Sequence, residues 1–122
     1  MAVDCSLEQM DQADLVVVPT IGGKIETVLA QEQDALPWLR FLHQGGADLA
    51  SNCTGAFLLA EAGLLDDKTA TTHWGFSQEF RHRYPQVNLN ERELITRDGN
   101  IFCAGGGTAW RDLTILLVER FC

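Results

Sequence analysis

The residues with the clearest chemical potential lie in the stretch Ser51-Asn52-Cys53-Thr54-Gly55. An apolar, strand-like run precedes Cys53 and an apolar helical run follows it, which predicts a sharp strand-to-helix corner at the cysteine. At such a corner the sulfur lies beside the first free N–H groups of the helix, which favour a thiolate. Gly55 fits because a side chain there would crowd the strand. We therefore predict a nucleophile elbow centred on Cys53.

His73 is the candidate partner of Cys53, either as a base or as an ion-pair partner. It follows a predicted short strand, Thr69 to Thr72, and the sequence alone does not bring the two side chains together. An ordinary capping or hydrogen-bonded histidine fits the same position. The backbone N–H groups of Thr54 and Gly55 are candidates for binding an oxyanion, or else they only start a helix.

Gly22 and Gly23 lie in the loop that follows the predicted strand Asp14 to Val18. Open α/β sheets bind ligands at the carboxyl edge of their strands, so both glycines are candidate ligand-binding residues. A plain turn is the alternative, because the sequence has no phosphate-loop or dinucleotide-binding glycine pattern.

The four cysteines are scattered and lack the close pairing of zinc sites or of a disulfide scaffold. We expect them to be reduced thiols, and we expect neither a bound metal nor a cofactor. They are Cys5, Cys53, Cys103 and Cys122.

Charge and length narrow the classes of function. The 122 residues suffice for one domain, and 9 basic against 17 acidic residues give a net charge of −8. A surface that grips phosphates needs the opposite balance, so we do not expect this segment itself to bind nucleic acid. No apolar run approaches the length of a membrane span, and no signal peptide precedes the first predicted strand. We expect a cytoplasmic protein.

The predicted elements form a single α/β unit. The continuous apolar run Asp14 to Val18 predicts a strand buried on both faces of a parallel sheet. A helix follows from Asp34 to the Gly45-Gly46 pair, with Leu36, Leu39, Phe41 and Leu42 on its apolar stripe, and leads into the elbow strand. Later segments predict a helix from Trp74 to Arg83, a hairpin turning at Asp98-Gly99, and a last helix from Thr108 to Phe121.

Three stretches resemble the ThiJ/PfpI superfamily. They are Ser51 to Leu65 around the elbow, Ala70-Thr71-Thr72-His73-Trp74, and Ala104 to Leu113, beginning Ala-Gly-Gly-Gly-Thr-Ala-Trp-Arg-Asp. The resemblance covers nearly the whole chain and is greatest to the sensor domain of GlxA-type AraC-family transcriptional regulators. It implies a flavodoxin-like, doubly wound, mostly parallel sheet carrying a nucleophile elbow.

The resemblance also implies that residues 1–122 form a partial domain. Members of this superfamily begin with a strand and further elements that carry an acidic residue beside the elbow cysteine, so the usual first strand is expected to be missing here. In the regulators, a helix-turn-helix DNA-binding module follows the domain. A sheet without its first strand exposes an unpaired edge, which leads us to expect dimerisation, strand exchange or a missing segment that covers the edge.

Two functions remain in competition. The first is a non-enzymatic sensor, which binds a small molecule or senses oxidation near Cys53 and acts on DNA only through a module absent from this chain. The second is a cysteine-dependent hydrolase or hydratase similar to isocyanide hydratases, which requires an acid or base within reach of Cys53, such as His73. We favour the sensor, because the acidic partner of the enzymes would lie before Met1 and because Ala109-Trp110-Arg111-Asp112 resembles the regulators.

Overall fold

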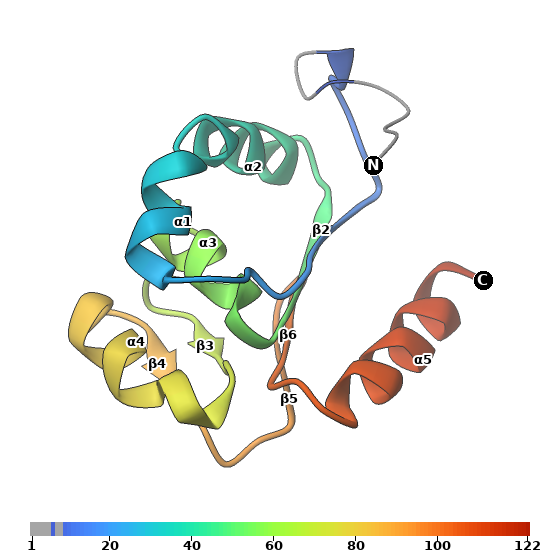
Figure 1. Ribbon diagram of the computed structural model, residues 1–122. Coiled ribbons are helices and arrows are strands. Elements are labelled where there is room, and N and C mark those ends of the chain that lie inside the picture. The colour runs from blue at the N-terminus through green and yellow to red at the C-terminus, as the bar shows by residue number, and fades with distance from the viewer. Residues whose placement is uncertain (1–5, 7–8) are drawn as a thin grey trace.

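The main sheet of the computed structural model has four strands in the order β1-β2-β6-β5 (Figure 1). The model describes Ser6 and residues 9–122. Strands β1, β2 and β6 run parallel, and β5 pairs antiparallel with β6. Strands β3 and β4 form a separate parallel pair. The strands are β1 (Leu15–Val18), β2 (Asp48–Asn52), β3 (Thr69–Ala70), β4 (Asn88–Leu89), β5 (Ile95–Asp98) and β6 (Ile101–Ala104).

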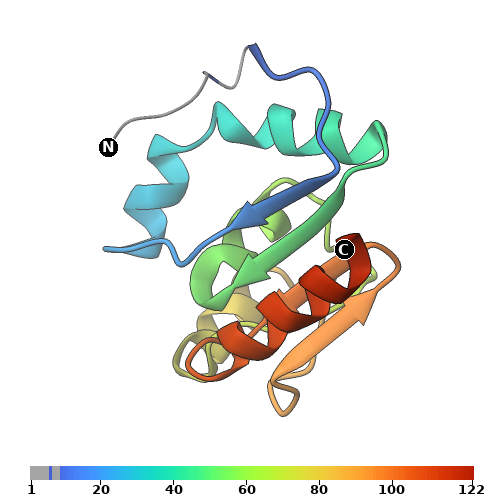
Figure 2. The ribbon, with the colours of Figure 1, turned by 90° about the vertical axis from the view of Figure 1, so that its right-hand side faces the viewer.

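Helices cover both faces of the main sheet. Figure 1 shows α1 to α4 on one side, and Figure 2 shows α5 lying alone across the other. This arrangement confirms the predicted doubly wound, mostly parallel α/β class. The helices are α1 (Ile25–Gln31), α2 (Ala35–Gln44), α3 (Ala56–Glu61), α4 (Ser77–Arg83) and α5 (Ala109–Phe121), with two short 3-10 turns, η2 (Cys53–Gly55) and η3 (Trp74–Phe76). Among the described residues, none of these helices has the length and apolar character to cross a membrane.

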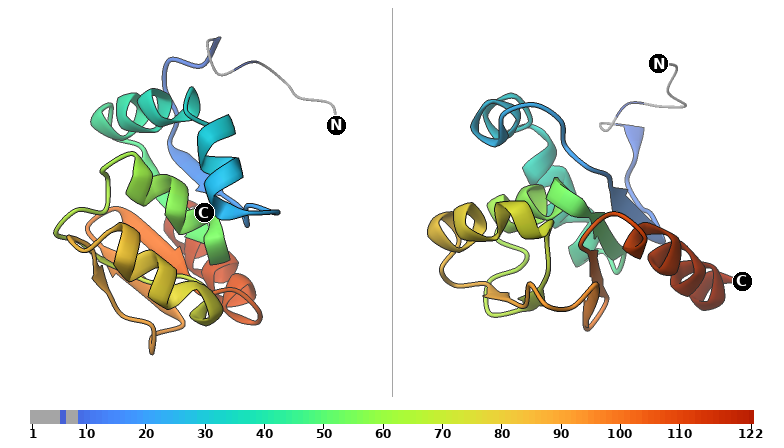
Figure 3. Two further views of the ribbon diagram at one scale, coloured as in Figure 1. Left: turned by 60° about the vertical axis from the view of Figure 1, so that its left-hand side comes forward. Right: turned by 60° about the horizontal axis from the view of Figure 1, so that its bottom comes forward.

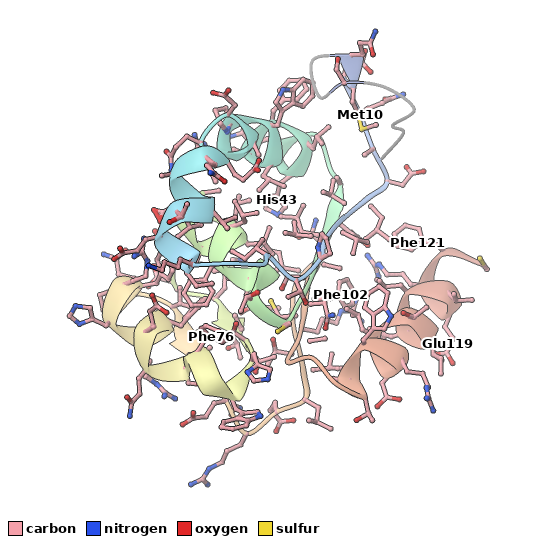
Figure 4. All side chains as sticks on the ribbon, viewed as in Figure 1. Met10, His43, Phe76, Phe102, Glu119 and Phe121 are labelled. Carbon is pink, nitrogen blue, oxygen red and sulfur yellow. The ribbon has the colours of Figure 1, made fainter. Side chains whose placement is uncertain are left out.

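The sheet separates two hydrophobic clusters. The larger lies under α1 to α4 and includes Leu49, Phe57 and Phe80. The smaller lies under α5 and centres on Phe102, which Figure 4 places between the sheet and that helix. Strands β2 and β6 are buried on both faces, because each has a neighbour on either side and helices above and below.

Strand β1 differs from the prediction in its burial. The run Asp14 to Val18 predicts burial on both faces, but β1 is an edge strand of the sheet and Val17 is 40% exposed. Figure 3 shows that α5 stands apart from the helices of the other face. The β-branched run therefore predicts the strand. It does not reveal that, among the described residues, β1 has a neighbouring strand on one side only.

Helix α2 buries Leu36, Leu39 and Leu42, as predicted. Phe41, which the sequence places on the same stripe, is instead 53% exposed and lies edge-on to Trp38 at 5.8 Å. Successive helical residues are turned by about 100°, so the neighbour of a buried leucine readily falls outside the buried face.

One polar network ties α1, α3 and α4 together. The guanidinium of Arg83 lies 3.7 Å from Glu26 and 3.5 Å from Glu61, and the hydroxyl of Tyr84 donates to Glu61 at 2.9 Å. The Tyr84 ring packs on Phe57 and Phe80. Burial raises the pKa of Tyr84 to about 12, while the hydrogen bond from Arg83 opposes the shift. The network holds α4 against the helix that follows the elbow.

We expect stability to fall as the pH rises from about 10 to about 12, because the unfolded chain loses the phenolic proton near pH 10 and the folded chain keeps it. Tyr84 is the single tyrosine of the sequence, so its ionisation can be followed directly by absorbance. Urea unfolding at several pH values measures how the free energy of unfolding falls with pH. Tyr84→Phe should remove the part of this fall that comes from ionisation of the phenol. An unchanged slope in this variant would contradict the assignment.

Gly55 lies against the end of β1. A Cβ built at this position would lie 2.4 Å from the carbonyl oxygen of Val18 and 2.5 Å from that of Pro19. Both neighbours are backbone atoms, which cannot rotate away. The glycine therefore lets the elbow pack directly on the loop after β1.

Gly55→Ala should lower the free energy of unfolding by about 1–3 kcal/mol, because the methyl group must push the elbow away from the end of β1 and the loop after it. Chemical denaturation measures the change. Gly22→Ala is the matched control, since a Cβ there meets no atom within 4 Å and its backbone is not in the left-handed region. Equal stability of the two variants would show that the contact at Gly55 is unimportant.

Candidate functional site

Cys53 occupies the corner between β2 and the helix that follows. Its φ is +55°, a conformation that non-glycine residues rarely adopt and that often marks functional positions. The predicted sharp corner at Cys53 is confirmed, with one difference: the chain first makes the 3-10 turn η2 and becomes α-helical only at Ala56. The thiol of Cys53 is free and half-buried.

Thr54 fixes the elbow to the loop after β1. Its hydroxyl donates to the carbonyl of Ile21 at 3.0 Å and accepts from the N–H of the same residue at 3.1 Å. The side chain is buried and fully used in these two bonds. Its position explains why the loop lies against Gly55.

The stretch Thr71-Thr72-His73-Trp74 connects the elbow with a second segment. The hydroxyl of Thr72 donates to the carbonyl of Cys53 at 2.9 Å, and that of Thr71 donates to the carbonyl of Glu93 at 3.1 Å. Both threonines are buried. The two side chains that precede His73 therefore fix the elbow and the segment before β5 relative to each other.

The imidazole of His73 is fixed by its own turn. Its Nδ1 accepts a hydrogen bond from the N–H of Gly75 at 3.0 Å, capping η3. The ring stacks on Trp74, with centroids 5.4 Å apart, and meets Phe76 edge-on at 5.8 Å. Because Nδ1 is an acceptor, the neutral ring carries its proton on Nε2.

Gly106 lies beside both Cys53 and His73. A Cβ at this glycine would lie 3.5 Å from the sulfur of Cys53 and 3.5 Å from Cδ2 of His73, so these two atoms are at most twice that distance apart. The φ of Gly106 is +98°, which favours glycine. The structure thus brings the two sequence-predicted residues together, with a glycine backbone facing both.

A pocket of about 250 Å³ opens beside His73. We call it the Trp74 pocket, because Trp74 is its most exposed aromatic residue. It lies next to the Cys53 corner through the shared neighbours Gly106 and His73. Its walls are formed by Thr72, His73, Trp74, Glu91, Glu93, Leu94 and residues 105–108.

Gly22 and Gly23 are located elsewhere. Gly23 lines a separate cleft of about 380 Å³ with Lys24, Phe76 and Glu79, and Gly22 has open space around it. The loop that carries them contacts the elbow through Ile21 and Pro19. These glycines are therefore near the elbow but do not line the Trp74 pocket.

The other thiols lie apart from this site. Cys103 is fully buried, and burial raises the pKa of its thiol, so it remains protonated in the core. Cys122 is exposed at the end of α5, and Cys5 lies outside the described residues. Within residue 6 and residues 9–122, no group of three His, Cys, Asp or Glu side chains has an arrangement suited to a metal ion.

Sequence reasoning missed Thr72 and the two glutamates of the pocket, Glu91 and Glu93. The glycines 105–107 fit either an approach to a ligand or a tight strand-to-helix turn, and the turn is the favoured interpretation. The available signal was the Thr-Thr pair before His73, because adjacent buried hydroxyls must find acceptors. Trp74 is 76% exposed at the pocket, although tryptophan is highly buried on average.

Comparisons with known proteins identify the family of the chain. The model of the DJ-1/PfpI family matches residues 1–120. The chain is 38% identical over 117 residues to the HTH-type transcriptional regulator CdhR of Pseudomonas aeruginosa, covering 96% of this chain and 34% of that one. It is 32% identical over 115 residues to the isonitrile hydratase of Pseudomonas putida, covering 94% and 48% respectively.

The structure of one known protein has a similar fold. A protein of Vibrio parahaemolyticus described as a transcriptional regulator superposes with a TM-score of 0.86 at 25% identity, covering 96% of this chain and 61% of that one. The chain thus spans half or less of the two sequence relatives and under two thirds of this structure. The match over residues 1–120 and the elbow geometry together show the family: the chain belongs to the DJ-1/PfpI family.

Proposed function

We propose that this chain is the signal-sensing domain of an AraC-family transcriptional regulator, which reads a small molecule or a redox signal beside Cys53. The observation that carries the proposal is the convergence of the Cys53 thiol and the His73 ring on Gly106, next to the Trp74 pocket. The relationship to CdhR, an HTH-type transcriptional regulator, supports a regulatory role.

The hydrogen bonding of His73 favours a sensor over a catalyst. A general base needs an unprotonated nitrogen that faces the thiol. In the neutral ring Nδ1 accepts from Gly75 and the proton occupies Nε2, so the ring offers a donor and no free base. Protonating Nδ1 would also remove the hydrogen bond from Gly75 that caps η3. The imidazole is thus suited to binding a group in the pocket.

A cysteine-dependent hydratase is the alternative. The relationship to the isonitrile hydratase of Pseudomonas putida supports it, and so does a half-buried thiol at an elbow. In that reaction the thiolate would add to the isonitrile carbon, and water would then release a formamide. The alternative requires a proton acceptor that faces the thiol, which His73 does not supply while its Nδ1 accepts from Gly75.

The proposal includes a homodimer in the cytoplasm and a DNA-binding module outside this chain. The net charge of −8 is unfavourable for binding DNA phosphates, which supports the placement of DNA binding in another module. The edge position of β1 and the exposed Ile115, Val118 and Phe121 on α5 support self-association.

Sedimentation velocity measures the oligomeric state, and a monomer at micromolar concentration would remove the dimer from the proposal.

The intact gene product that contains this chain should bind DNA from the region upstream of its own gene in a gel-shift assay. It should also convert cyclohexyl isonitrile to the formamide no faster than Cys53→Ala does, with the formyl proton followed by NMR. Failure to bind DNA together with Cys53-dependent formamide production would replace the sensor with the hydratase.

The proximity of Gly106 to the thiol gives a direct test of access to the site. In Gly106→Ala the new methyl group would lie 3.3 Å from Cβ and 3.5 Å from the sulfur of Cys53. We expect alkylation of Cys53 by iodoacetamide to slow by about fivefold or more relative to exposed Cys122, because the methyl group blocks one side of the thiol. Mass spectrometry of the labelled peptides measures both rates.

Gly107→Ala is the matched control for this test. Gly107 also has a positive φ, +61°, but a Cβ there meets no atom within 4 Å. Both variants therefore carry backbone strain, and only Gly106→Ala crowds Cys53. Equal slowing in the two would show that strain, and not the contact, controls access to the thiol.

A further inference from the structure

The side chain of Thr72 reaches the backbone of the elbow cysteine from a distant part of the chain. Only 2% of the residue is exposed, and its hydroxyl donates to the carbonyl of Cys53 at 2.9 Å across 19 positions of sequence. A buried hydroxyl needs an acceptor, and this bond provides one. The same bond fixes one atom of the sharp corner at Cys53.

Thr72 is itself held in place by both of its neighbours. The hydroxyl of Thr71 donates to the carbonyl of Glu93 at 3.1 Å, and Nδ1 of His73 accepts from the N–H of Gly75 at 3.0 Å. A β-branched side chain also has few rotamers available to it. The hydroxyl of Thr72 is therefore a fixed donor, against which the backbone of the elbow is aligned.

The peptide group that joins Cys53 to Thr54 is the part of the elbow that this donor contacts. A trans peptide group is planar, with its C=O and N–H on opposite sides. Holding the carbonyl of Cys53 toward Thr72 therefore turns the N–H of Thr54 away from Thr72. Among the described residues, this N–H forms no hydrogen bond with a loop or with a side chain. It belongs to the first turn after the strand, where helices leave their donors unpaired.

The other contacts of the elbow leave this peptide group without support. The hydroxyl of Thr54 donates to Ile21, and Gly55 lies against the loop after β1, so neither contact involves the carbonyl of Cys53. The φ of Cys53, +55°, is a conformation that costs free energy in a non-glycine residue. Without the hydroxyl of Thr72, rotation of the peptide group would be less restricted, and the N–H of Thr54 would lose its fixed direction.

We propose that Thr72 is a positioning residue, whose hydroxyl orients the peptide group between Cys53 and Thr54 so that the N–H of Thr54 is presented beside the thiol. At a nucleophile elbow, the N–H that follows the nucleophile can stabilise negative charge on an oxygen atom. The inference rests on the proposed sensing site at Cys53 and adds the residue that sets the direction of its backbone donor. Thr72 acts in this role through the backbone of the elbow.

Two reagents that react with the same sulfur test this role in the intact protein. With p-nitrophenyl acetate, the thiolate attacks the ester carbonyl, a C–S bond forms, and negative charge gathers on the carbonyl oxygen until p-nitrophenolate leaves with the bonding electrons. Iodoacetamide forms a C–S bond by displacing iodide, without an oxyanion. Both reactions use the thiolate, so its fraction cancels in the ratio of acetylation rate to alkylation rate at one pH. Mass spectrometry of the Cys53 and Cys122 peptides measures the ratio for each thiol.

We expect the wild-type ratio at Cys53 to exceed that at exposed Cys122. Thr72→Val should lower the ratio at Cys53 by about tenfold or more, because one oriented donor is lost to the oxyanion. Thr72→Ser keeps a hydroxyl and should restore most of the wild-type ratio. Thr71→Val is the matched control, since it removes a neighbouring buried hydroxyl that donates to the carbonyl of Glu93 and should leave the ratio unchanged.

Thr72→Ala covers the case in which Thr72→Val does not fold, because it also lacks the hydroxyl and should give the same low ratio. Circular dichroism verifies the folding of each variant. Failure of both variants to fold would show that the hydroxyl supports the whole fold, which overturns a role specific to this peptide group.

The other contrary outcomes also overturn the proposal. A wild-type ratio at Cys53 no higher than that at Cys122 would show that no donor is presented to the oxyanion. An unchanged ratio in Thr72→Val would show that the hydroxyl does not set the direction of the N–H. An equal fall in Thr71→Val, or no recovery in Thr72→Ser, would assign the effect to general loosening of the segment. None of these results affects the gel-shift test, so failure of the positioning role is distinguishable from failure of the sensing function.

Discussion

The site depends on the close packing of the elbow against the end of β1. Only a glycine fits at position 55, because two carbonyl oxygens occupy the place of its side chain. Thr54 adds two hydrogen bonds to the same loop through Ile21. With both following residues held, the chain can leave β2 only by turning sharply at Cys53, which explains its positive φ. The half-exposed thiol is thus a consequence of backbone packing.

The two threonines before His73 extend this constraint to the pocket. Thr72 holds the carbonyl of the elbow cysteine, and Thr71 holds the carbonyl of Glu93. A displacement of the segment that carries Glu93 would therefore be transmitted to the elbow through two adjacent residues. A sensing domain needs such a connection between the place where a ligand binds and the rest of the fold, because a ligand shifts only what it contacts differentially.

The two faces of the sheet differ in how completely they are covered. Four helices bury one face, and α5 alone packs on the other, where Phe102 fills the space beneath it (Figure 4). Arg120 and Asp48 form an ion pair beside this ring, and Arg97 stacks over it. The outer side of α5 carries exposed apolar residues, which distinguishes this face as a candidate for association. The Trp74 pocket is lined by residues 105–108, which lead directly into α5.

The sequence by itself determined the elements and the corner. Apolar runs located β1, β2 and α5, and the pattern around Gly55 predicted the elbow, because strand burial and tight turns impose local rules on residue type. The exposure of Phe41 and Val17 escaped it, since local pattern does not reveal which neighbour is present. Only the tertiary structure decided that His73 and Cys53 both lie beside Gly106 and that Gly22 and Gly23 lie outside the pocket. The physical reason is that these segments lie far apart along the chain, and their distances in space are set by the strand order and by the hydrogen bonds of buried hydroxyl groups. No periodicity along the chain encodes these distances.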